Sequence, residues 1–136
     1  MKQQRIGRID ISALNAPPEK HEYETARYFT SRGLDIAFIK PSNIKGTHSP
    51  DYRMLGRDWE IKSPIGKSNR TFEDNLRKAI KQSPHIIFDL RRLKPDAEKM
   101  CLMILSEQSN KPEIRTLLAI TRDGRLLTIK GEFSIM

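Results

Sequence analysis

The stretch Ser49–Pro64, SPDYRMLGRDWEIKSP, decides the fold, because polar and apolar residues alternate on both sides of a Gly56-Arg57 step. Alternation with a period of two predicts half-buried strands, and the glycine between them predicts a tight hairpin turn. We take Gly56 and Arg57 as the two central turn residues. The expected cross-strand pairs are then Leu55 with Asp58, Met54 with Trp59, Arg53 with Glu60, Tyr52 with Ile61, and Asp51 with Lys62.

Directly opposed residues share one face of a sheet, so this pairing sorts the hairpin into two faces. The apolar face carries Tyr52, Met54, Trp59 and Ile61, which we expect to pack into the core. The charged face carries Asp51, Arg53, Glu60 and Lys62. Two interpretations are open: a solvated outer face with Asp51–Lys62 and Arg53–Glu60 pairs, or a metal site built on one face of the sheet.

Composition indicates one soluble domain over residues 1–136 with a polyanionic partner. The net charge of +8 favours nucleic acid, while 37% hydrophobic and 31% charged residues indicate a globular chain rather than a low-complexity or collagen-like one. The single cysteine, Cys101, lies in the apolar run Met100–Leu105 and is expected to be a buried thiol. We expect no secretory leader, because the first residues lack an apolar core, and no apolar run approaches the ~18 residues of a membrane span.

The remaining pattern predicts an α/β sandwich around a mixed sheet. Pro95–Leu105 is ambiguous, and we expect a helix in its first half and a strand in its second. The other expected elements are a short strand with Ile6, Ile9 and Ile11, a helix from about Pro18 to Ser31, a strand Leu34–Ile39, a helix capped by Asn69 or Thr71 that reaches about Gln82, a strand Ile86–Leu90, and a hairpin of Arg115–Thr121 with Arg125–Lys130.

Both expected helices carry charged side chains that bear on the choice between these two interpretations. In the first, Glu22 projects toward the apolar stripe of Tyr23, Ala26 and Phe29, which is unusual because burying a bare carboxylate is costly. In the second, the expected core face is Phe72, Leu76, Ala79 and Ile80. Its other side is basic, with Arg70, Arg77, Lys78 and Lys81, and is suited to holding phosphates.

Pro50-Asp51, eight intervening residues and Glu60-Ile61-Lys62 resemble the PD-(D/E)XK nuclease signature, with Glu22 where that family carries a helical glutamate. A wider pattern resembles the tRNA-nuclease domain at the C-terminus of CdiA contact-dependent growth inhibition toxins. It consists of His21-Glu22 through Ala26, Gly33, Ser49–Asp51, Trp59–Pro64, Asn75–Ala79 with Gln82-Ser83, and Ile86–Leu90. The resemblance covers about Glu19 to Arg92 and implies a restriction-endonuclease-like αβββαβ core, a mixed sheet flanked by helices, with a C-terminal β-hairpin.

The resemblance gives these residues catalytic and metal-binding roles. Asp51, Glu60 and the backbone carbonyl of Ile61 offer hard oxygen ligands that suit Mg²⁺ or Mn²⁺. Zn²⁺ is disfavoured, because the histidines lack the close spacing of a zinc site and there is no second cysteine. Lys62 could orient the attacking water and offset charge in the transition state. Glu22 is expected as a further catalytic group and metal ligand.

Gln82, Lys78, Arg77 and Lys67 are the expected substrate-binding residues. By resemblance Gln82 positions the substrate or orders the site, although an exposed glutamine at a helix end explains it equally well. The expected function is a metal-dependent endonuclease that cleaves RNA, with tRNA favoured by the resemblance alone. A DNA endonuclease of the restriction or repair type and a non-catalytic nucleic-acid-binding module are the alternatives.

The same resemblance implies partners and a place of action. We expect an acidic cognate immunity protein as inhibitor, a monomeric toxin, no membrane partner, and action in the cytoplasm of a target cell.

Overall fold

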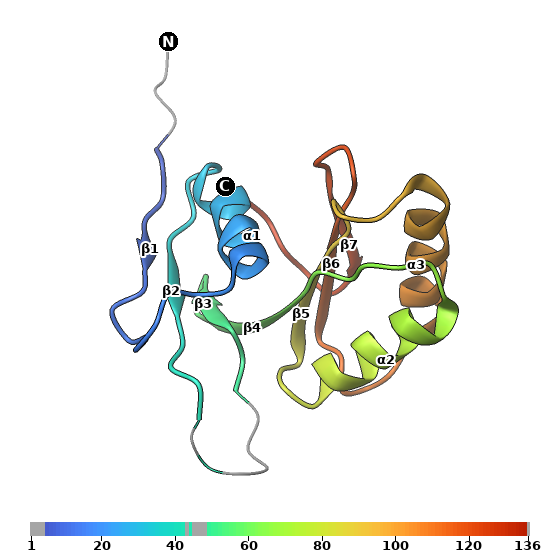
Figure 1. Cartoon of the computed structure of the whole chain (residues 1–136), viewed down its shortest axis with the longest axis horizontal. Coiled ribbons are helices and arrows are strands. Elements are labelled where there is room, and N and C mark those ends of the chain that lie inside the picture. Colours follow the sequence, from blue (N-terminus) through green and yellow to red (C-terminus); the bar gives the residue numbers. More distant parts are fainter. Residues whose placement is uncertain (1–4, 43, 45–48, 136) are drawn as a thin grey trace. The chain divides into compact units, whose positions relative to one another are not determined.

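A computed structural model describes residues 5–42, 44 and 49–135 of the chain. The described residues divide into two compact units, one formed by residues up to 59 with 134–135 and one formed by residues 60–133. The described elements in chain order are β1 (Ile9–Asp10), α1 (Lys20–Thr30), β2 (Ile36–Phe38), β3 (Tyr52–Met54), β4 (Arg57–Lys62), α2 (Asn69–Ile80), β5 (His85–Asp89), α3 (Pro95–Gln108), β6 (Thr116–Ile120) and β7 (Leu126–Lys130) (Figure 1).

The described strands follow one another in the order β1 to β7, and β4 contains residues of both units. Strands β1 and β2 are parallel, as are β5 and β6. The pairs β2–β3, β3–β4 and β6–β7 are antiparallel. This mixture of strand directions, with helices between the strands, confirms the predicted mixed α/β fold and its C-terminal hairpin. The single-domain organisation over residues 1–136 stays a prediction.

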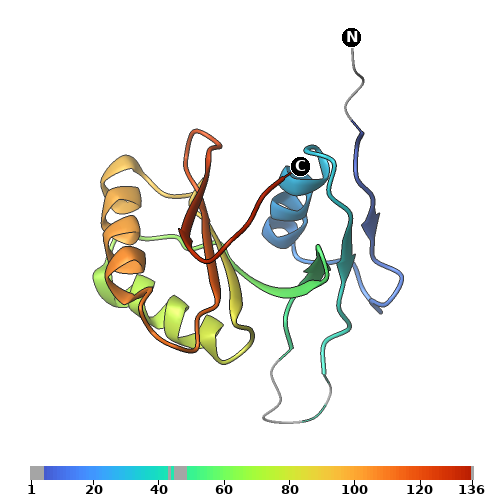
Figure 2. The ribbon, with the colours of Figure 1, turned by 180° about the vertical axis from the view of Figure 1, so that it is seen from behind.

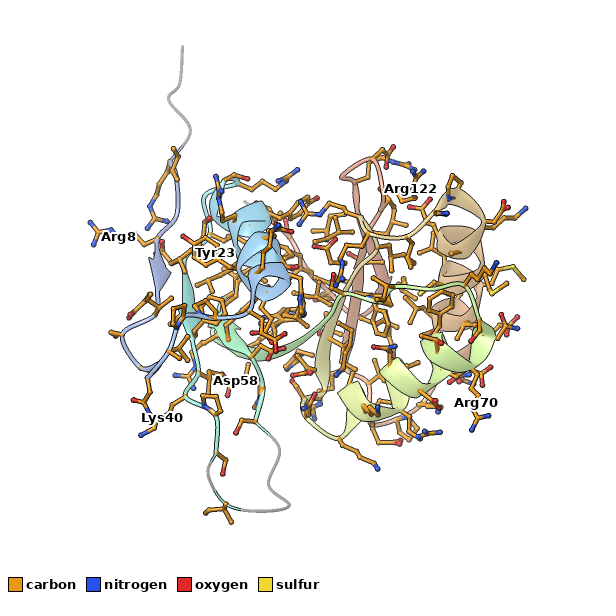
Figure 3. All side chains as sticks on the ribbon, viewed as in Figure 1. Arg8, Tyr23, Lys40, Asp58, Arg70 and Arg122 are labelled. Atoms are coloured by element: carbon orange, nitrogen blue, oxygen red, sulfur yellow. The ribbon has the colours of Figure 1, made fainter. Side chains whose placement is uncertain are left out.

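In the first unit, α1 buries a face close to the expected one. Ala26 and Phe29 are fully buried, as predicted, but Tyr23 is 39% exposed and lies on the outer side of the helix (Figure 3). Tyr28 takes its place in the packed face, with the guanidinium of Arg32 lying 3.5 Å from the centre of its ring. The expected inward position of Tyr23 is therefore wrong, because the buried arc of α1 is rotated about the helix axis toward Thr25 and Tyr28.

The β3–β4 hairpin has a different register from the expected one. Its turn is Leu55-Gly56, with φ of 52° and 72°, and the observed pairs are Tyr52 with Trp59, Arg53 with Asp58, and Met54 with Arg57. Two successive positive φ angles are the geometry of a tight type I′ hairpin turn. The expected pairs, including Arg53–Glu60 and Asp51–Lys62, are therefore wrong.

The displacement of the register is two residues, which leaves every side chain on its predicted face, because strand side chains alternate with a period of two. Tyr52, Met54 and Trp59 are accordingly buried, each exposed by no more than 1%. The hydrophobic pattern alone could not distinguish the two registers.

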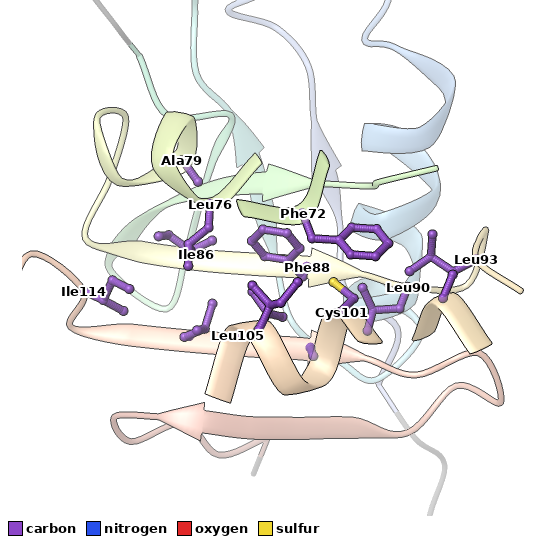
Figure 4. Packing of buried hydrophobic residues seen from close by; sticks show 14 residues of the cluster. Phe72, Leu76, Ala79, Ile86, Phe88, Leu90, Leu93, Cys101, Leu105 and Ile114 are labelled. Atoms are coloured by element: carbon purple, nitrogen blue, oxygen red, sulfur yellow. The ribbon is translucent and has the colours of Figure 1, made fainter. Parts of the chain in front are cut away.

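In the second unit, α2 and α3 lie on the same side of strands β5, β6 and β7 (Figures 1 and 2). The two helices enclose a core with alternate residues of the strands (Figure 4). Fully buried members of this core are Phe72, Leu76, Ala79, Ile86, Phe88, Leu90, Cys101, Leu105, Leu117 and Ala119. The cap of α2 is Ser68, whose hydroxyl accepts from the Thr71 N–H at 3.1 Å, one residue before the nearer expected cap.

The expected strand in the second half of Pro95–Leu105 is wrong, because the whole segment belongs to α3. Ala97, Cys101, Ile104 and Leu105 follow the helical spacing of one buried face and pack into the core. Met103 lies between them on the outside, 55% exposed, and gave the run its strand-like continuity. Within the described ranges, no helix has the length and apolar character needed to cross a membrane.

We predict that Leu55→Gly stabilises the protein by about 1 kcal/mol, because Leu55 holds a left-handed backbone conformation that costs a residue with a Cβ about that much. The free energy of unfolding in urea measures the effect. Arg57→Gly is the matched control and should destabilise, since Arg57 lies in β4. The opposite ranking of the two variants would contradict the observed turn.

We predict that Cys101 makes the protein less stable as the pH rises above about 9. Burial raises the pKa of its thiol from 9.0 to about 12, so the unfolded chain loses this proton in a range where the folded chain keeps it. Below the unfolded pKa the contribution is fully present and constant. Unfolding free energies of the natural protein and Cys101→Ala, compared from pH 8 to 11, should diverge by at most about 1.4 kcal/mol per pH unit. Parallel curves would contradict the prediction.

Candidate active site

Glu60 and Lys62 lie two residues apart on β4 and therefore on the same side of the strand. The Lys62 Nζ lies 3.2 Å from Glu60 Oε2. The Glu60 side chain is only 4% exposed, and that of Lys62 is 20% exposed. The interpretation of this face as a solvated surface is therefore wrong for Glu60, whose carboxylate is held in the interior by an amine.

Gln82 supplies a second polar group to the same carboxylate. It follows the last turn of α2, where its backbone N–H donates to the carbonyl of Ala79 at 2.9 Å. With the carboxamide nitrogen turned toward Glu60, Gln82 donates to Oε1 at 3.1 Å and also to Oε2. The end of α2 thus brings an amide, and β4 an amine, to one buried carboxylate.

Asp51 belongs to the first unit, where hydrogen bonds fix its backbone on both sides. Its N–H donates to the carbonyl of Trp59 at 2.8 Å, and its own carbonyl accepts from the N–H of Ile39 at 3.0 Å. The Trp59 indole in turn donates to the carbonyl of Met54 at 2.9 Å, which stabilises the β3–β4 hairpin. Asp51 is half-buried, and it directly precedes β3.

Glu22 is half-buried in the first turn of α1, beside two potential metal ligands that were not expected. Ligand atoms of Glu19, His21 and Glu22 all lie within 4.8 Å of one another, and His21 Nε2 lies 3.0 Å from Glu19 Oε2. Their spacing around the start of a helix was the signal available in the sequence. Exposed acidic groups of this kind are common without an ion, so the cluster by itself assigns no metal.

The expected substrate-binding cations lie in and before α2. Lys67, Arg77 and Lys78 are all exposed. Arg77 is partly neutralised, because its Nη2 lies 2.8 Å from Asp74 Oδ1. Lys67 and Lys78 therefore present the stronger positive charge to a ligand. The side chain of Ile61 is 5% exposed, and the ligand role of its carbonyl stays a prediction.

On the outer face of the hairpin, Arg53 donates from Nε to Asp58 Oδ1 at 2.8 Å, in place of the expected pair with Glu60. Both side chains are well exposed, at 64% and 41%, so this is an ordinary surface ion pair of small energetic value.

We predict that Lys62→Met lowers the free energy of unfolding by about 1–3 kcal/mol, because it leaves the buried Glu60 carboxylate without its cation. Adding Glu60→Gln should recover part of this loss, giving a positive coupling in a double-mutant cycle. Lys67→Met, an exposed lysine, is the control and should have almost no effect. Strictly additive effects of the Glu60 and Lys62 changes would contradict the pair.

Two comparisons with known proteins gave a match, one by sequence family and one by fold. The sequence model of the contact-dependent growth inhibition CdiA C-terminal domain matches residues 48–126, more than half of the chain. Among solved structures, the CdiA-CT/CdiI toxin and immunity complex from Burkholderia pseudomallei contains a chain with the same fold. The TM-score is 0.63 at 18% identity, covering 91% of this chain and 99% of that one. A search of curated proteins found no match. The chain therefore belongs to the CdiA C-terminal domain family of contact-dependent growth inhibition proteins.

Proposed function

We propose that this chain is a metal-dependent endonuclease that cleaves RNA phosphodiester bonds, with tRNA as substrate, and inhibits growth by doing so. The observation that carries the proposal is the buried Glu60 carboxylate with Lys62 and Gln82 directed at it. Removing an amine and a carboxylate from water is costly, and a hydrophobic pair would serve the fold as well. Proteins depart from such rules chiefly where function requires it.

The donor chemistry of these groups fits a hard cation. Asp51 and Glu60 supply carboxylate oxygens, Ile61 supplies a carbonyl oxygen, and Glu22 is a further ligand; this is the oxygen set that Mg²⁺ or Mn²⁺ prefers. When bound, the ion would polarise the scissile phosphate and lower the pKa of a coordinated water. Asp51 is included in this set because of its position in the PD-(D/E)XK signature.

Lys62 and Gln82 provide the remaining chemistry. The Lys62 ammonium has three donor hydrogens, so it can hold the Glu60 carboxylate and still orient a water or contact the phosphate. Its charge offsets the negative charge that develops as the phosphate is attacked. Gln82 fixes the carboxylate in one orientation, which would help Glu60 to hold an ion.

We infer the substrate and the partners of this chain from its charge and from its family. A net charge of +8, with Lys67, Arg77 and Lys78 around α2, suits a polyanion. The choice of tRNA over DNA rests on the family resemblance. The solved relative is a toxin in complex with an immunity protein, so we further propose an acidic immunity protein for this chain, with action as a monomer in the cytoplasm of a target cell.

We predict that the purified chain cleaves total tRNA in Mg²⁺ or Mn²⁺, that EDTA abolishes cleavage, and that Glu60→Ala and Lys62→Ala each lower the rate by at least ~100-fold. Gel analysis of labelled tRNA measures the rate. Arg53→Ala on the opposite strand of the hairpin is the matched control and should keep full activity, because it removes only an exposed ion pair.

Two outcomes would replace the proposal. Nicking of supercoiled plasmid with intact tRNA would make the chain a DNA endonuclease. Metal-independent RNA binding that survives combined alanine substitution of Asp51, Glu60 and Lys62, without cleavage in any condition, would make it a binding module.

A further inference from the structure

Four arginines lie at one edge of the second unit, where strands β5 and β6 end side by side. Arg91 and Arg92 follow β5, and Arg122 and Arg125 occupy the turn between β6 and β7. All four are exposed, yet they differ in what holds their guanidinium groups. That difference separates two arginines that serve the fold from two that remain available to a ligand.

Arg91 and Arg125 are each neutralised by a neighbouring carboxylate. Arg91 donates from Nε to Asp89 Oδ1 at 2.9 Å and from Nη2 to Oδ2 at 2.7 Å, and the Asp89 side chain is only 5% exposed. The Arg125 Nε lies 3.2 Å from Asp123 Oδ2. A hydrogen bond from the Thr121 hydroxyl, helped by Arg125, lowers the pKa of Asp123, so this aspartate stays ionised beside its arginine.

Arg92 and Arg122 are instead anchored on backbone carbonyls. Arg92 donates from Nη1 to the carbonyl of Ser63 at 3.1 Å, and Arg122 donates from Nε to the carbonyl of Leu93 at 2.6 Å. Among the described residues, the Glu98 carboxylate contacts Arg122 through the backbone N–H of Arg122, at 2.6 Å. In the described part of the chain, no carboxylate lies within ion-pair distance of either guanidinium. Each therefore keeps its full charge and four of its five donor hydrogens.

The two anchors also relate these charges to each other and to the candidate active site through neighbouring backbone positions. Leu93, whose carbonyl holds Arg122, is the residue after Arg92. Ser63, whose carbonyl holds Arg92, is the residue after Lys62. Figure 3 shows Arg122 at the turn between β6 and β7, beside the loop that leads into α3. The Arg92 guanidinium is thus anchored on the backbone one residue beyond Lys62.

We propose that Arg92 and Arg122 form a binding site for backbone phosphates of the nucleic acid, next to the scissile position; this rests on the function proposed above. Guanidinium groups bind phosphate through two parallel hydrogen bonds, which a lysine cannot imitate. Their backbone anchors hold the side chains in place beforehand, so less side-chain freedom is lost when the phosphate binds. These are base-independent contacts, which position a strand without reading its sequence.

The test measures binding of fluorescently labelled tRNA to the full chain in EDTA over a series of salt concentrations. We expect Arg92→Gln with Arg122→Gln to weaken binding about tenfold, and to reduce the slope of log affinity against log salt by about 2, close to one per lost phosphate contact. Arg92→Lys with Arg122→Lys should keep most of the slope but only part of the affinity, which a merely structural role would not predict.

Arg125→Gln is the matched control, because it removes one charge from the same turn but from an arginine that Asp123 already neutralises. Its slope should equal that of the natural protein. Equal affinity and slope for the Arg92/Arg122 glutamine variant and Arg125→Gln, with unchanged thermal unfolding, would overturn the inference. So would dependence of poly-glutamate binding, but not tRNA binding, on the two arginines, since the site would then fit an acidic protein.

Cleavage is scored separately from binding. A reduced slope in a chain that never cleaves tRNA would support this site while removing the proposed nuclease. Cleavage with an unchanged slope would support the nuclease while removing this site.

Discussion

A carboxylate taken out of water must be compensated by its neighbours, and Glu60 imposes that requirement on the second unit of this protein. Its compensation comes from Lys62 at 3.2 Å on the same strand and from the Gln82 amide at the end of α2. That end is placed by the core, because Phe72, Leu76 and Ala79 pack α2 into the buried cluster. The apolar face of α2 must therefore pack correctly before Gln82 can reach the Glu60 carboxylate on β4.

Most of the fold could be predicted because local signals agreed with one another. The periodic apolar face of α2 and the C-terminal hairpin were both confirmed. The hairpin register could not be obtained from polarity, since a displacement of two residues leaves both faces unchanged. The register is set by the Leu55-Gly56 turn. Leu55 is an exposed residue in a left-handed conformation that its side chain does not favour. No propensity argument would have put a leucine there.

The sequence indicated residues of the candidate site but not the contacts between them. Residue type, spacing and the family resemblance indicated Asp51, Glu60 and Lys62, but the expected pairs did not include the ion pair that Lys62 forms with Glu60. The bond between Gln82 and Glu60 lay beyond the pattern, because it depends on where a helix ends against a strand far away in sequence. The carbonyl anchors of Arg92 and Arg122 were equally hidden, since a backbone acceptor leaves no mark in the sequence.

The hydrogen-bond partners of the arginines distinguish neutralised from available positive charges, which composition does not. A net charge of +8 says only that positive groups exceed negative ones. Arg53, Arg77 and Arg91 each lie within 2.8 Å of an aspartate oxygen, and so add little to the field that a distant polyanion feels. Arginines held by carbonyl groups keep their charge while losing their freedom, which favours oriented contact over diffuse attraction. The distribution of anchors, rather than the number of arginines, therefore indicates where a phosphate chain would lie.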